Sequence, residues 1–518
     1  MSSTRAFPLL RAVDRLRAEH FDLLVMGGGI YGAWTACDAA QRGLRVALIE
    51  ARDWAAGTSS ASSKLIHGGL RYLENFEFGL VRESLRERRT LARIAPHHVH
   101  GLRFVLPVWE GGVANRLKLA AGLATYDVLA GLDPPAGRHR HLESARLKRE
   151  FPWLNQQDVK GAFSYGDCQH DDARTTLTVV AAAQAAGAAC ANRITAETLL
   201  EDAGRIIGAR LHDTETDTHF ELRAPAVVAA TGPWSAAFAA GAADEIERIR
   251  GIHLILPAIP GCDHAFILSA PRDGRAFFVI PWYGRSLVGT TESTVSAQDF
   301  NTPANTHASA AETAYLLDAL HARLPGLGWA AQDVIASFAG ARTLRRAPSQ
   351  NLSDVSRDFD LLAPKPGLWL PLGGKFTTAR AESERIVDAV CAALKAPRHP
   401  CITATTPLPG APDGDDYAAW ESAQLGALRH MTMARLNPFV AASLLHRYGT
   451  RVTDVIARIT DDPRLAARLH PELPFIAAET VIARHDEMAR SPDDVYRRRV
   501  PLTILARDGE WMKGSSER

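Results

Sequence analysis

Short apolar runs alternate with glycine-rich turns and helical stretches over the first part of the chain. Asp22–Met26 is a Leu- and Val-rich run of the kind found in buried parallel strands. Ile30–Gln41 predicts a helix, and Arg45–Ile49 predicts a second strand that ends at Glu50. The order strand, turn, helix, strand predicts a βαβ unit and therefore an α/β fold.

The hydrophobic pattern differs in the middle of the chain. The charge-rich stretch Glu74–Ala95 predicts a surface helix, and the alanine-rich stretch 175–192 predicts a helix packed on a sheet. Short β-rich runs at Ile252–Leu256, Ala276–Ile280 and Ser286–Gly289 are separated by Gly, Pro and Asp. Such runs are typical of an antiparallel sheet, so they predict a second domain.

Helical patterns mark both ends of the chain. Residues 1–20 predict a helical extension. Two more apolar runs, Val227–Ala230 and Leu368–Leu372, each predict a strand followed by a glycine turn. Pro407–Asp416 has the composition of a linker, and the pattern beyond it is helical.

The turn after the first predicted strand carries glycines at the G-x-G-x-x-G spacing, at Gly27, Gly29 and Gly32. They allow a tight turn, a close backbone approach to a pyrophosphate and close packing of helix and strand, while the helix N-terminus attracts phosphate. Glu50 stands where a carboxylate would accept hydrogen bonds from a ribose diol, and it would repel the 2′-phosphate of NADP. The motif predicts a dinucleotide site and leaves FAD and NAD as alternatives.

Composition narrows the class of protein. The chain has 518 residues, which predicts two or three domains, and its net charge of +1 provides no overall field for nucleic acid or anionic lipid. The six cysteines are scattered without a C-x-x-C pair, which indicates a reducing compartment and neither a disulfide framework nor a zinc site. Residues 1–20 show no secretory signal. The uncharged run Ala224–Ala243 contains Gly232 and Pro233, which favours a strand and turn over a membrane span.

The segment Thr58–Tyr72 is unusually rich in groups that bind anions. It follows Glu50 closely and is therefore expected near the carboxyl ends of the strands, where open α/β sheets bind ligands. Its hydroxyls, Lys64 and backbone N–H groups suit a pyrophosphate, and Arg71 suits a substrate anion. A solvated loop is the alternative.

Two later segments, Gly340–Leu344 and Leu372–Thr378, form further clusters. A Gly-Gly pair before Lys375 would let the backbone pass close to a flat ring, and the helix start that follows would bring N–H groups near a flavin carbonyl. The alternative for Lys375 is an ordinary surface lysine.

In chain order, the motifs GGGIYGA, TSSASSKLIHGGLRYLE, DCQHDDAR, AATGPW, GTTE, AGARTL, SRDFDL and LGGKFTT resemble the FAD-dependent glycerol-3-phosphate dehydrogenases. The resemblance spans residues 21–395 and extends more loosely to HRYGT at 446–450. It implies an FAD-binding Rossmann-like domain interleaved with an α+β substrate (cap) domain, plus a C-terminal helical domain. The expected boundaries are 1–20 for the N-terminal extension, 21–95, 160–250 and 335–395 for the FAD domain, 96–159 and 251–334 for the cap, and 415–518 for the helical domain.

The resemblance also implies site residues. Those that would hold FAD are Gly27, Gly29, Gly32, Glu50, Thr58, Ser59, Ser62, Lys64, His67, Gly68, Gly232, Gly374, Lys375, Phe376 and Thr377. Those that would line the substrate pocket are Arg71, Tyr72, His253, Arg342, Arg357 and Lys375, of which His253, Lys375, Arg342 and Arg71 would be catalytic. Cations suit a phosphate monoester. His253 is the first candidate for the base, with a structural histidine as the alternative.

The implied reaction is oxidation of sn-glycerol 3-phosphate to dihydroxyacetone phosphate, with the C2 hydride passing to FAD and the electrons to a quinone. It implies a cytoplasmic protein held peripherally on the inner face of the membrane. Arg116–Leu132 and the basic N-terminal helix are candidate contacts, and a homodimer is a further expectation. One alternative is a flavin oxidase that uses oxygen on another phosphorylated polyol, a hydroxy acid or an amine; another is an idle flavoprotein subunit. No metal is expected.

Three residues depart from the family pattern near the site. Tyr31 stands where many members have a small polar residue, Ile252 replaces a small residue before His253, and Thr343 replaces a proline after Arg342. None of them removes an expected ligand, but they leave room for a different substrate or acceptor.

Overall fold

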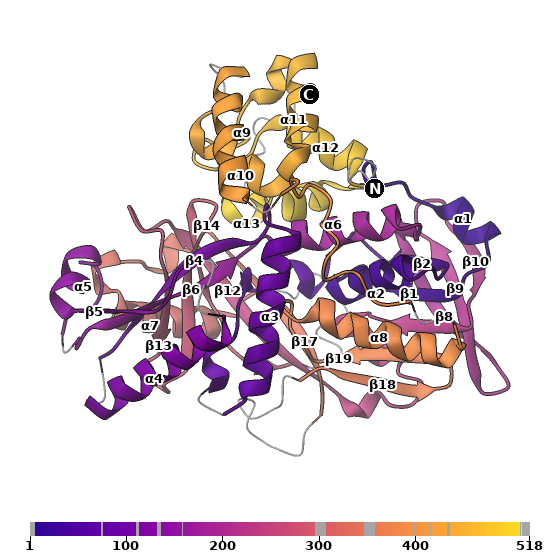
Figure 1. Cartoon of the computed structure of the whole chain (residues 1–518), viewed down its shortest axis with the longest axis horizontal. Helices are drawn as coiled ribbons and strands as arrows, with labels where there is room; N and C mark the ends of the chain where they lie inside the picture. The colour runs from indigo at the N-terminus through magenta and orange to yellow at the C-terminus, as the bar shows by residue number, and fades with distance from the viewer. Residues whose placement is uncertain are drawn as a thin grey trace.

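Two sheet-based bodies lie side by side beneath a cluster of C-terminal helices (Figure 1). The computed structural model describes residues 6–73, 76–109, 113–131, 136–157, 159–295, 307–346, 358–396, 399–414, 416–431, 436–507 and 509. Within these residues, no helix combines the length and the apolar character that a membrane crossing requires.

The first body is built on a six-stranded sheet in the order β18-β19-β11-β1-β2-β7. Its strands are β1 (Leu23–Met26), β2 (Val46–Glu50), β7 (Ala189–Asn192), β11 (Ala226–Ala229), β18 (Asp360–Lys365) and β19 (Leu368–Leu372). All neighbouring pairs are parallel except β18 with β19. The predicted βαβ unit is confirmed, because α2 (Ile30–Gln41) connects the adjacent parallel strands β1 and β2.

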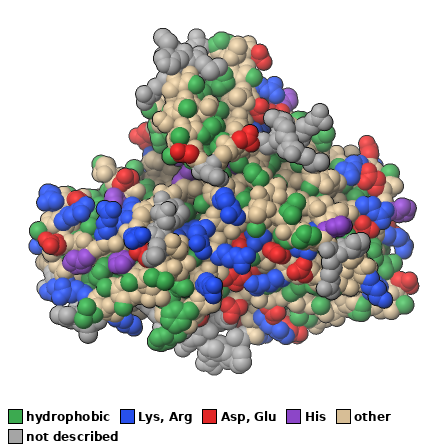
Figure 2. All heavy atoms as spheres, in the orientation of Figure 1, with side chains coloured by type: hydrophobic (Ala, Val, Ile, Leu, Met, Phe, Trp, Pro, Cys, Tyr) green, Lys and Arg blue, Asp and Glu red, His purple; other side chains and the backbone are tan. Residues whose placement is uncertain are grey.

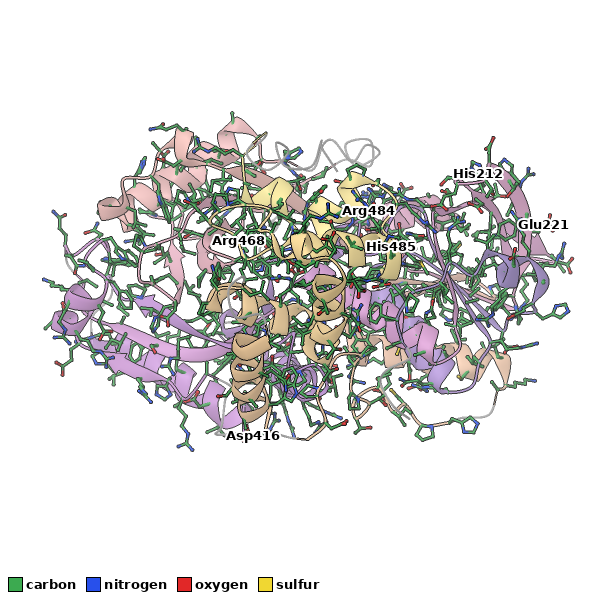
Figure 3. All side chains as sticks on the ribbon, turned by 90° about the horizontal axis from the view of Figure 1, so that it is seen from above. His212, Glu221, Asp416, Arg468, Arg484 and His485 are labelled. Carbon is green, nitrogen blue, oxygen red and sulfur yellow. The ribbon has the colours of Figure 1, made fainter. Side chains whose placement is uncertain are left out.

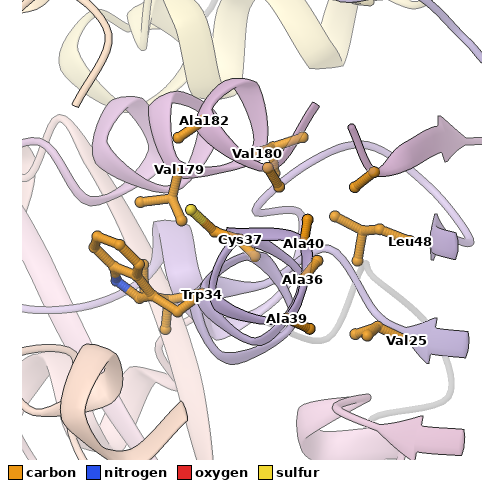
Figure 4. Packing of buried hydrophobic residues seen from close by; sticks show 14 of the residues in the cluster. Val25, Trp34, Ala36, Cys37, Ala39, Ala40, Leu48, Val179, Val180 and Ala182 are labelled. Atoms are coloured by element: carbon orange, nitrogen blue, oxygen red, sulfur yellow. The ribbon is translucent and has the colours of Figure 1, made fainter. Parts of the chain in front are cut away.

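Helices cover one face of this sheet. α2 packs between α6 (Asp172–Ala185) and α8 (Ala379–Leu394). Figure 4 shows the small residues of α2, such as Ala36 and Ala40, turned toward β-strand and α6 side chains. The predicted alanine-rich helix is confirmed in its first part only, because the chain turns at Gly187, which has φ +104°, and enters β7.

A three-stranded antiparallel sheet covers the opposite face, with the order β10-β9-β8. Its strands are β8 (Ile194–Asp202), β9 (Arg205–Asp213) and β10 (Thr218–Arg223), and its buried residues share a core with β1, β2, β11 and β19. The N-terminal extension contributes one short helix, α1 (Val13–Ala18), beside β7 and β10.

The second body is the ten-stranded sheet. Its strands are β3 (Leu65–Ile66), β4 (His100–Pro107), β5 (Arg140–Leu142), β6 (Ala162–Gln169), β12 (Ile246–Pro257), β13 (Ala265–Ser269), β14 (Ala276–Trp282), β15 (Arg285–Gly289), β16 (Ser293–Thr294) and β17 (Ala336–Arg345). Around it lie α3 (Phe78–Ile94), α4 (Val113–Leu129), α5 (Ser144–Glu150) and α7 (Ala310–Arg323). The predicted antiparallel runs and the helix after residue 74 are therefore confirmed.

Two segments lie in a different sheet from the one expected. β6 and β17 fall within ranges assigned to the FAD domain, yet both belong to the ten-stranded sheet. β6 pairs with β4 over its whole length and β17 pairs with β12, both antiparallel. These long antiparallel ladders satisfy the backbone groups of both strands, and sequence position alone does not reveal them.

The C-terminal part is helical, as predicted. It contains α9 (Tyr417–Met431), α10 (Pro438–Tyr448), α11 (Val452–Asp461), α12 (Ala477–Asp486), a π-helical turn (Asp494–Arg499) and α13 (Leu502–Leu505). It is joined to the first body by a buried ion pair in which Arg174 Nη1 lies 2.6 Å from Glu487 Oε2. Burial opposes the charge of Glu487, but Arg174 and Arg451 outweigh this and lower its pKa to about 2.

Replacing Arg174 with Met is expected to lower the free energy of unfolding by up to about 3–5 kcal/mol, because the buried Glu487 carboxylate loses its nearest cation and keeps only the longer contacts with Arg451 and Arg499. The matched control is Arg15→Met, which removes an exposed pair with Glu19 and should cost about 0–1 kcal/mol. Denaturant titration of the two variants gives the comparison. Equal midpoints would show that the buried pair does not hold the helical part in place.

Candidate functional site

A cavity of about 890 Å³ lies between the two sheets. Its wall includes the residues that directly follow the carboxyl ends of β1, β2, β11 and β19, together with parts of β12 and β17. This is the edge at which open α/β sheets bind ligands. The structure therefore brings segments from both bodies to one place.

The glycine turn after β1 is packed too tightly for side chains. A Cβ at Gly27, where φ is +110°, would lie 2.4 Å from Ala230 O, and one at Gly32 would lie 1.8 Å from Gly27 O. Gly27 and Gly29 line the cavity, whereas Gly32 lies behind it and lets α2 approach the turn. The N-terminus of α2 thus faces the cavity, which suits a phosphate group.

Glu50 lies in the cavity wall and is oriented by backbone donors. Its Oε2 accepts a hydrogen bond from Gly28 N at 2.7 Å and its Oε1 accepts one from Arg52 N at 2.8 Å. Burial raises its pKa. A carboxylate has about four acceptor sites, so two remain for the hydroxyls of a ribose. Beside it, the Arg52 guanidinium lies 4.5 Å from the ring centroid of Trp234.

The hydroxyls of the serine-rich loop mainly hold the loop in place. Ser59 Oγ accepts a hydrogen bond from Ile30 N at 2.9 Å, and Thr58 Oγ1 donates to Ala341 O at 2.6 Å. Ser62 Oγ donates to Asp172 Oδ2 at 2.7 Å. These three residues line the cavity, so the loop presents a preorganised wall.

Lys64 does not lie in the cavity wall, and its expected contact with FAD stays a prediction. Its Nζ is buried 2.5 Å from Asp172 Oδ1 and donates to Ser60 O at 2.8 Å. The ammonium is also 5.0 Å from the ring centroid of Trp282. A buried charge needs a counter-charge, and Asp172 at the start of α6 provides it, so this lysine braces the loop from behind.

The loop after β19 passes very close to α2. Gly373 and Gly374 have φ of +70° and +71°, and a Cβ on Gly374 would lie 1.7 Å from the Tyr31 hydroxyl. That hydroxyl donates to Glu382. Lys375, Phe376 and Thr377 follow in the cavity wall. Lys375 is half-buried there, unlike an ordinary exposed surface lysine.

Cations and aromatic rings gather at the end of the cavity formed by the ten-stranded sheet. Arg342, Lys375, Tyr72 and His253 all line it. Lys375 Nζ lies 3.7 Å from the ring centroid of Tyr72, and Arg342 Nη1 lies 3.7 Å from Glu292 Oε1. This end is therefore positively charged and partly apolar, which suits an organic phosphate.

His253 is buried and neutral at physiological pH. Burial, with the charges of Lys64 and Arg342, lowers its pKa to about 3. Its Nε2 lies 2.9 Å from Ser63 Oγ, and its ring stacks on Phe338 at a centroid distance of 5.1 Å. A neutral imidazole held in this way has the protonation state that a general base needs.

The remaining expected residues differ in where they lie. His67 and Gly232 line the cavity, and burial lowers the pKa of His67 to about 4. Gly68 lies outside the wall, and its N–H donates to Tyr126 Oη at 2.9 Å. Arg71 lies in the short turn Leu70–Leu73, but its side chain is not among those that the structure describes, and Arg357 lies outside the described residues.

Sequence reasoning missed other wall residues. Ser63 is the partner of His253, and Glu292 is the partner of Arg342. Ser63 belongs to the serine-rich segment and Glu292 to the GTTE motif, so the only signal was membership of these motifs. Asp172, which neutralises Lys64, lies in DCQHDDAR in the same way.

Two family models together match most of the chain. One, described as FAD dependent oxidoreductase, matches residues 22–381. The other, described as the C-terminal domain of alpha-glycerophosphate oxidase, matches residues 401–512.

Relatives extend the match over nearly the whole chain. Glycerol-3-phosphate dehydrogenase 2 of Mycobacterium tuberculosis is 36% identical over 512 residues, which cover 96% of this chain and 84% of the relative. Aerobic glycerol-3-phosphate dehydrogenase of Bacillus subtilis is 32% identical over 97% of this chain and 90% of its own. The crystal structure of the Bacillus halodurans glycerol-3-phosphate dehydrogenase complexed with FAD has a TM-score of 0.76 and 26% identity, covering 96% and 89% of the two chains.

The residues of the cavity fit FAD. The glycine cradle at Gly27 and the N-terminus of α2 suit its pyrophosphate, and Glu50 retains free acceptor sites for a ribose. The fold-level expectation of an FAD-binding domain is thereby confirmed.

Replacing Gly374 with Ala is expected to release most of the flavin, because the added Cβ would collide with the Tyr31 hydroxyl in the cavity wall. Gly187→Ala is the matched control, since Gly187 also has a positive φ but no heavy atom within 4 Å of an added Cβ. Flavin absorbance relative to protein absorbance after gel filtration measures the effect. Equal flavin content in both variants would contradict the close approach at residue 374.

Proposed function

The chain belongs to the FAD-dependent glycerol-3-phosphate dehydrogenase family, and on that premise we propose that it oxidises sn-glycerol 3-phosphate to dihydroxyacetone phosphate in this cavity. The observation that carries the proposal is that Arg342 and Lys375 line the same cavity as the buried, neutral His253, and that the charge of Arg342 acts on this histidine. Cations would bind the phosphate, and an uncharged base would face the carbinol.

Bound FAD supplies the two-electron acceptor for the hydride that leaves C2. Arg342 lies on β17 and Lys375 lies in the loop after β19, so the two cations reach the cavity from separate segments of the chain. A dianion between two cations would be held in one position. Holding the reacting groups in a fixed geometry lowers the activation barrier, typically by several kcal/mol. Glu292 near Arg342 keeps the guanidinium directed while the site is free of phosphate.

His253 would accept the proton of the C2 hydroxyl. Its low pKa keeps the imidazole neutral over the physiological range, and the hydrogen bond with Ser63 orients Nε2. The positive charges that lower this pKa would be offset by the bound phosphate dianion, so the imidazole becomes a stronger base when substrate is present. Proton acceptance is thus coupled to phosphate binding.

We propose a quinone as the electron acceptor, and a peripheral position of the protein on the inner face of the membrane. α4 supports this, because Leu117, Ala121, Ala124 and Val128 form an exposed apolar stripe at helical spacing, with Lys118 exposed beside them. Figure 2 shows hydrophobic side chains gathered along the lower edge, where Figure 1 places α4 and the start of α3. A homodimer stays a prediction.

The basic N-terminal helix is a weaker candidate for the membrane contact. Arg15 forms an ion pair with Glu19, and Arg11 forms one with Asp213. Arginines engaged in this way have less charge to offer to anionic lipids, so α4 is the better supported surface.

Oxygen is the alternative acceptor. The match of residues 401–512 to the C-terminal domain of alpha-glycerophosphate oxidase favours it. Stoichiometric hydrogen peroxide during turnover, without quinone reduction, would assign the oxidase reaction in place of the dehydrogenase reaction.

Glycerol 3-phosphate should bleach the bound flavin under anaerobic conditions. In Arg342→Ala the substrate concentration for half-maximal bleaching should rise about 10- to 100-fold, equivalent to the roughly 1.5–3 kcal/mol of a hydrogen bond to a charged group. Arg345→Ala is the matched control on the same strand, since Arg345 pairs with Glu245 and Asp360 outside the cavity. Stopped-flow absorbance gives the rates. No bleaching of the unaltered protein would refute the reaction, and unchanged saturation in Arg342→Ala would refute the anchor.

Leu117→Glu combined with Val128→Glu should abolish flotation with anionic lipid vesicles, because each side chain is more than 60% exposed on the proposed contact face. Reduction of a soluble dye should be unchanged, while reduction of a quinone embedded in vesicles should fall. Ile402→Glu, at an exposed apolar residue outside α4, is the control. Retained flotation of the double variant would move the contact to another surface.

A further inference from the structure

We propose that Glu197, His212 and His219 form a binding site for a first-row transition-metal dication, with Zn²⁺ as the reference ion. Glu197 lies on β8, His212 on β9 and His219 on β10 of the three-stranded sheet. Figure 3 shows His212 at the outer edge of the molecule, away from the C-terminal helices. The inference does not depend on the proposed function.

The strand register brings the two histidines together. His212 and His219 are directly opposed on the antiparallel pair β9–β10, so their side chains lie on the same face. Their rings are stacked with centroids 4.3 Å apart and planes inclined by 9°.

A β-bulge brings the carboxylate to the histidines. The pairing of β8 with β9 shifts between Ala196 and Thr198, which leaves Glu197 as the extra residue. Bulges of this kind redirect a side chain. Glu197 Oε2 lies 3.1 Å from His219 Nδ1 as a result.

The spacing of the ligand atoms suits one ion. One ligand atom from each residue lies within 4.8 Å of one from each of the others. Metal bonds of about 2.1 Å put two ligands of one ion no more than about 4.2 Å apart, so a small rotation of these side chains closes the site. Glu197 and His219 are exposed and free to make it.

The donor set determines the class of metal. Two imidazoles with one carboxylate suit Zn²⁺, Ni²⁺ or Cu²⁺, whereas Ca²⁺ and Mg²⁺ prefer all-oxygen sites. Asp217 supports one of the ligands, because its Oδ1 lies 2.8 Å from His212 Nε2 in the turn before β10 and orients that ring. Arg210 Nε, 3.2 Å from Glu197 Oε2, competes for the carboxylate and would have to yield it.

Metal binding at this site would brace a wall of the cofactor cavity. Ile194, Thr195 and Ala196 line the cavity and immediately precede Glu197 on β8. An ion held by Glu197 and the two histidines would tie this strand to the β9–β10 hairpin. Since the ion binds the folded sheet, it should raise the thermal midpoint of the protein as its concentration increases.

Isothermal titration of the FAD-loaded full chain with ZnCl₂ tests the proposal. One Zn²⁺ should bind the unaltered protein, and excess Mg²⁺ or Ca²⁺ should not displace it. His212→Ala, His219→Ala and Glu197→Gln should each weaken this binding at least about 10-fold, since even the loss of a supporting partner of a metal ligand costs that much. His264→Ala is the matched control. His264 also pairs with a carboxylate, that of Asp263, but it belongs to no group of three ligands among the described residues.

The same variants give a second measurement. Zn²⁺ should raise the thermal midpoint of the unaltered protein and of His264→Ala, and it should leave His212→Ala unchanged. If a histidine variant fails to fold, Glu197→Gln at an exposed position carries the test. Equal Zn²⁺ affinity in the unaltered protein, His212→Ala and Glu197→Gln would overturn the site.

Discussion

Buried carboxylates that are neutralised by cations from distant segments hold the cofactor loop in its place. The Asp53 carboxylate, just after β2, lies 2.6 Å from Arg498 Nε and 2.5 Å from Arg499 Nη1 of the C-terminal part. Further along the same loop, Lys64 forms an ion pair with Asp172 of α6. A buried charge without its partner is very costly, so each pair specifies one arrangement of loop, helix and C-terminal turn. The helical domain is therefore part of the support of the cavity and not an appendage.

The same electrostatics govern the proposed chemistry. Burial is the main cause of the low pKa of His253 and of His67; Lys64 and Arg342 lower the first further, and Lys375 and Arg342 lower the second further. Histidines near these cations stay neutral, so the net positive charge of the substrate end comes from the guanidinium and the ammonium. A phosphate dianion would relieve this excess charge and at the same time make His253 more basic. Binding and proton acceptance would then be linked through one field.

The departures from the family pattern have separate structural consequences. Ile252 is fully buried in the core of the ten-stranded sheet. The carbonyl oxygen of Thr343 accepts a hydrogen bond from Gly373 N at 2.6 Å. Neither lessens the number of cations in the cavity. Tyr31 differs from these two, because its hydroxyl occupies the space next to Gly374 and donates to Glu382 inside the wall. Any change in flavin properties relative to the family is therefore expected to come from Tyr31.

By itself, the sequence determined the βαβ unit, the antiparallel second sheet, the helical tail and the family, because periodicity, glycine spacing and ordered motifs are local properties. It also identified Glu50, Arg342, Lys375 and His253, which share one cavity in the structure. Only the tertiary structure decided that Lys64 faces Asp172 and that β6 and β17 join the ten-stranded sheet. These outcomes depend on which distant groups neutralise a buried charge or complete a strand ladder, and no local pattern encodes such a partner.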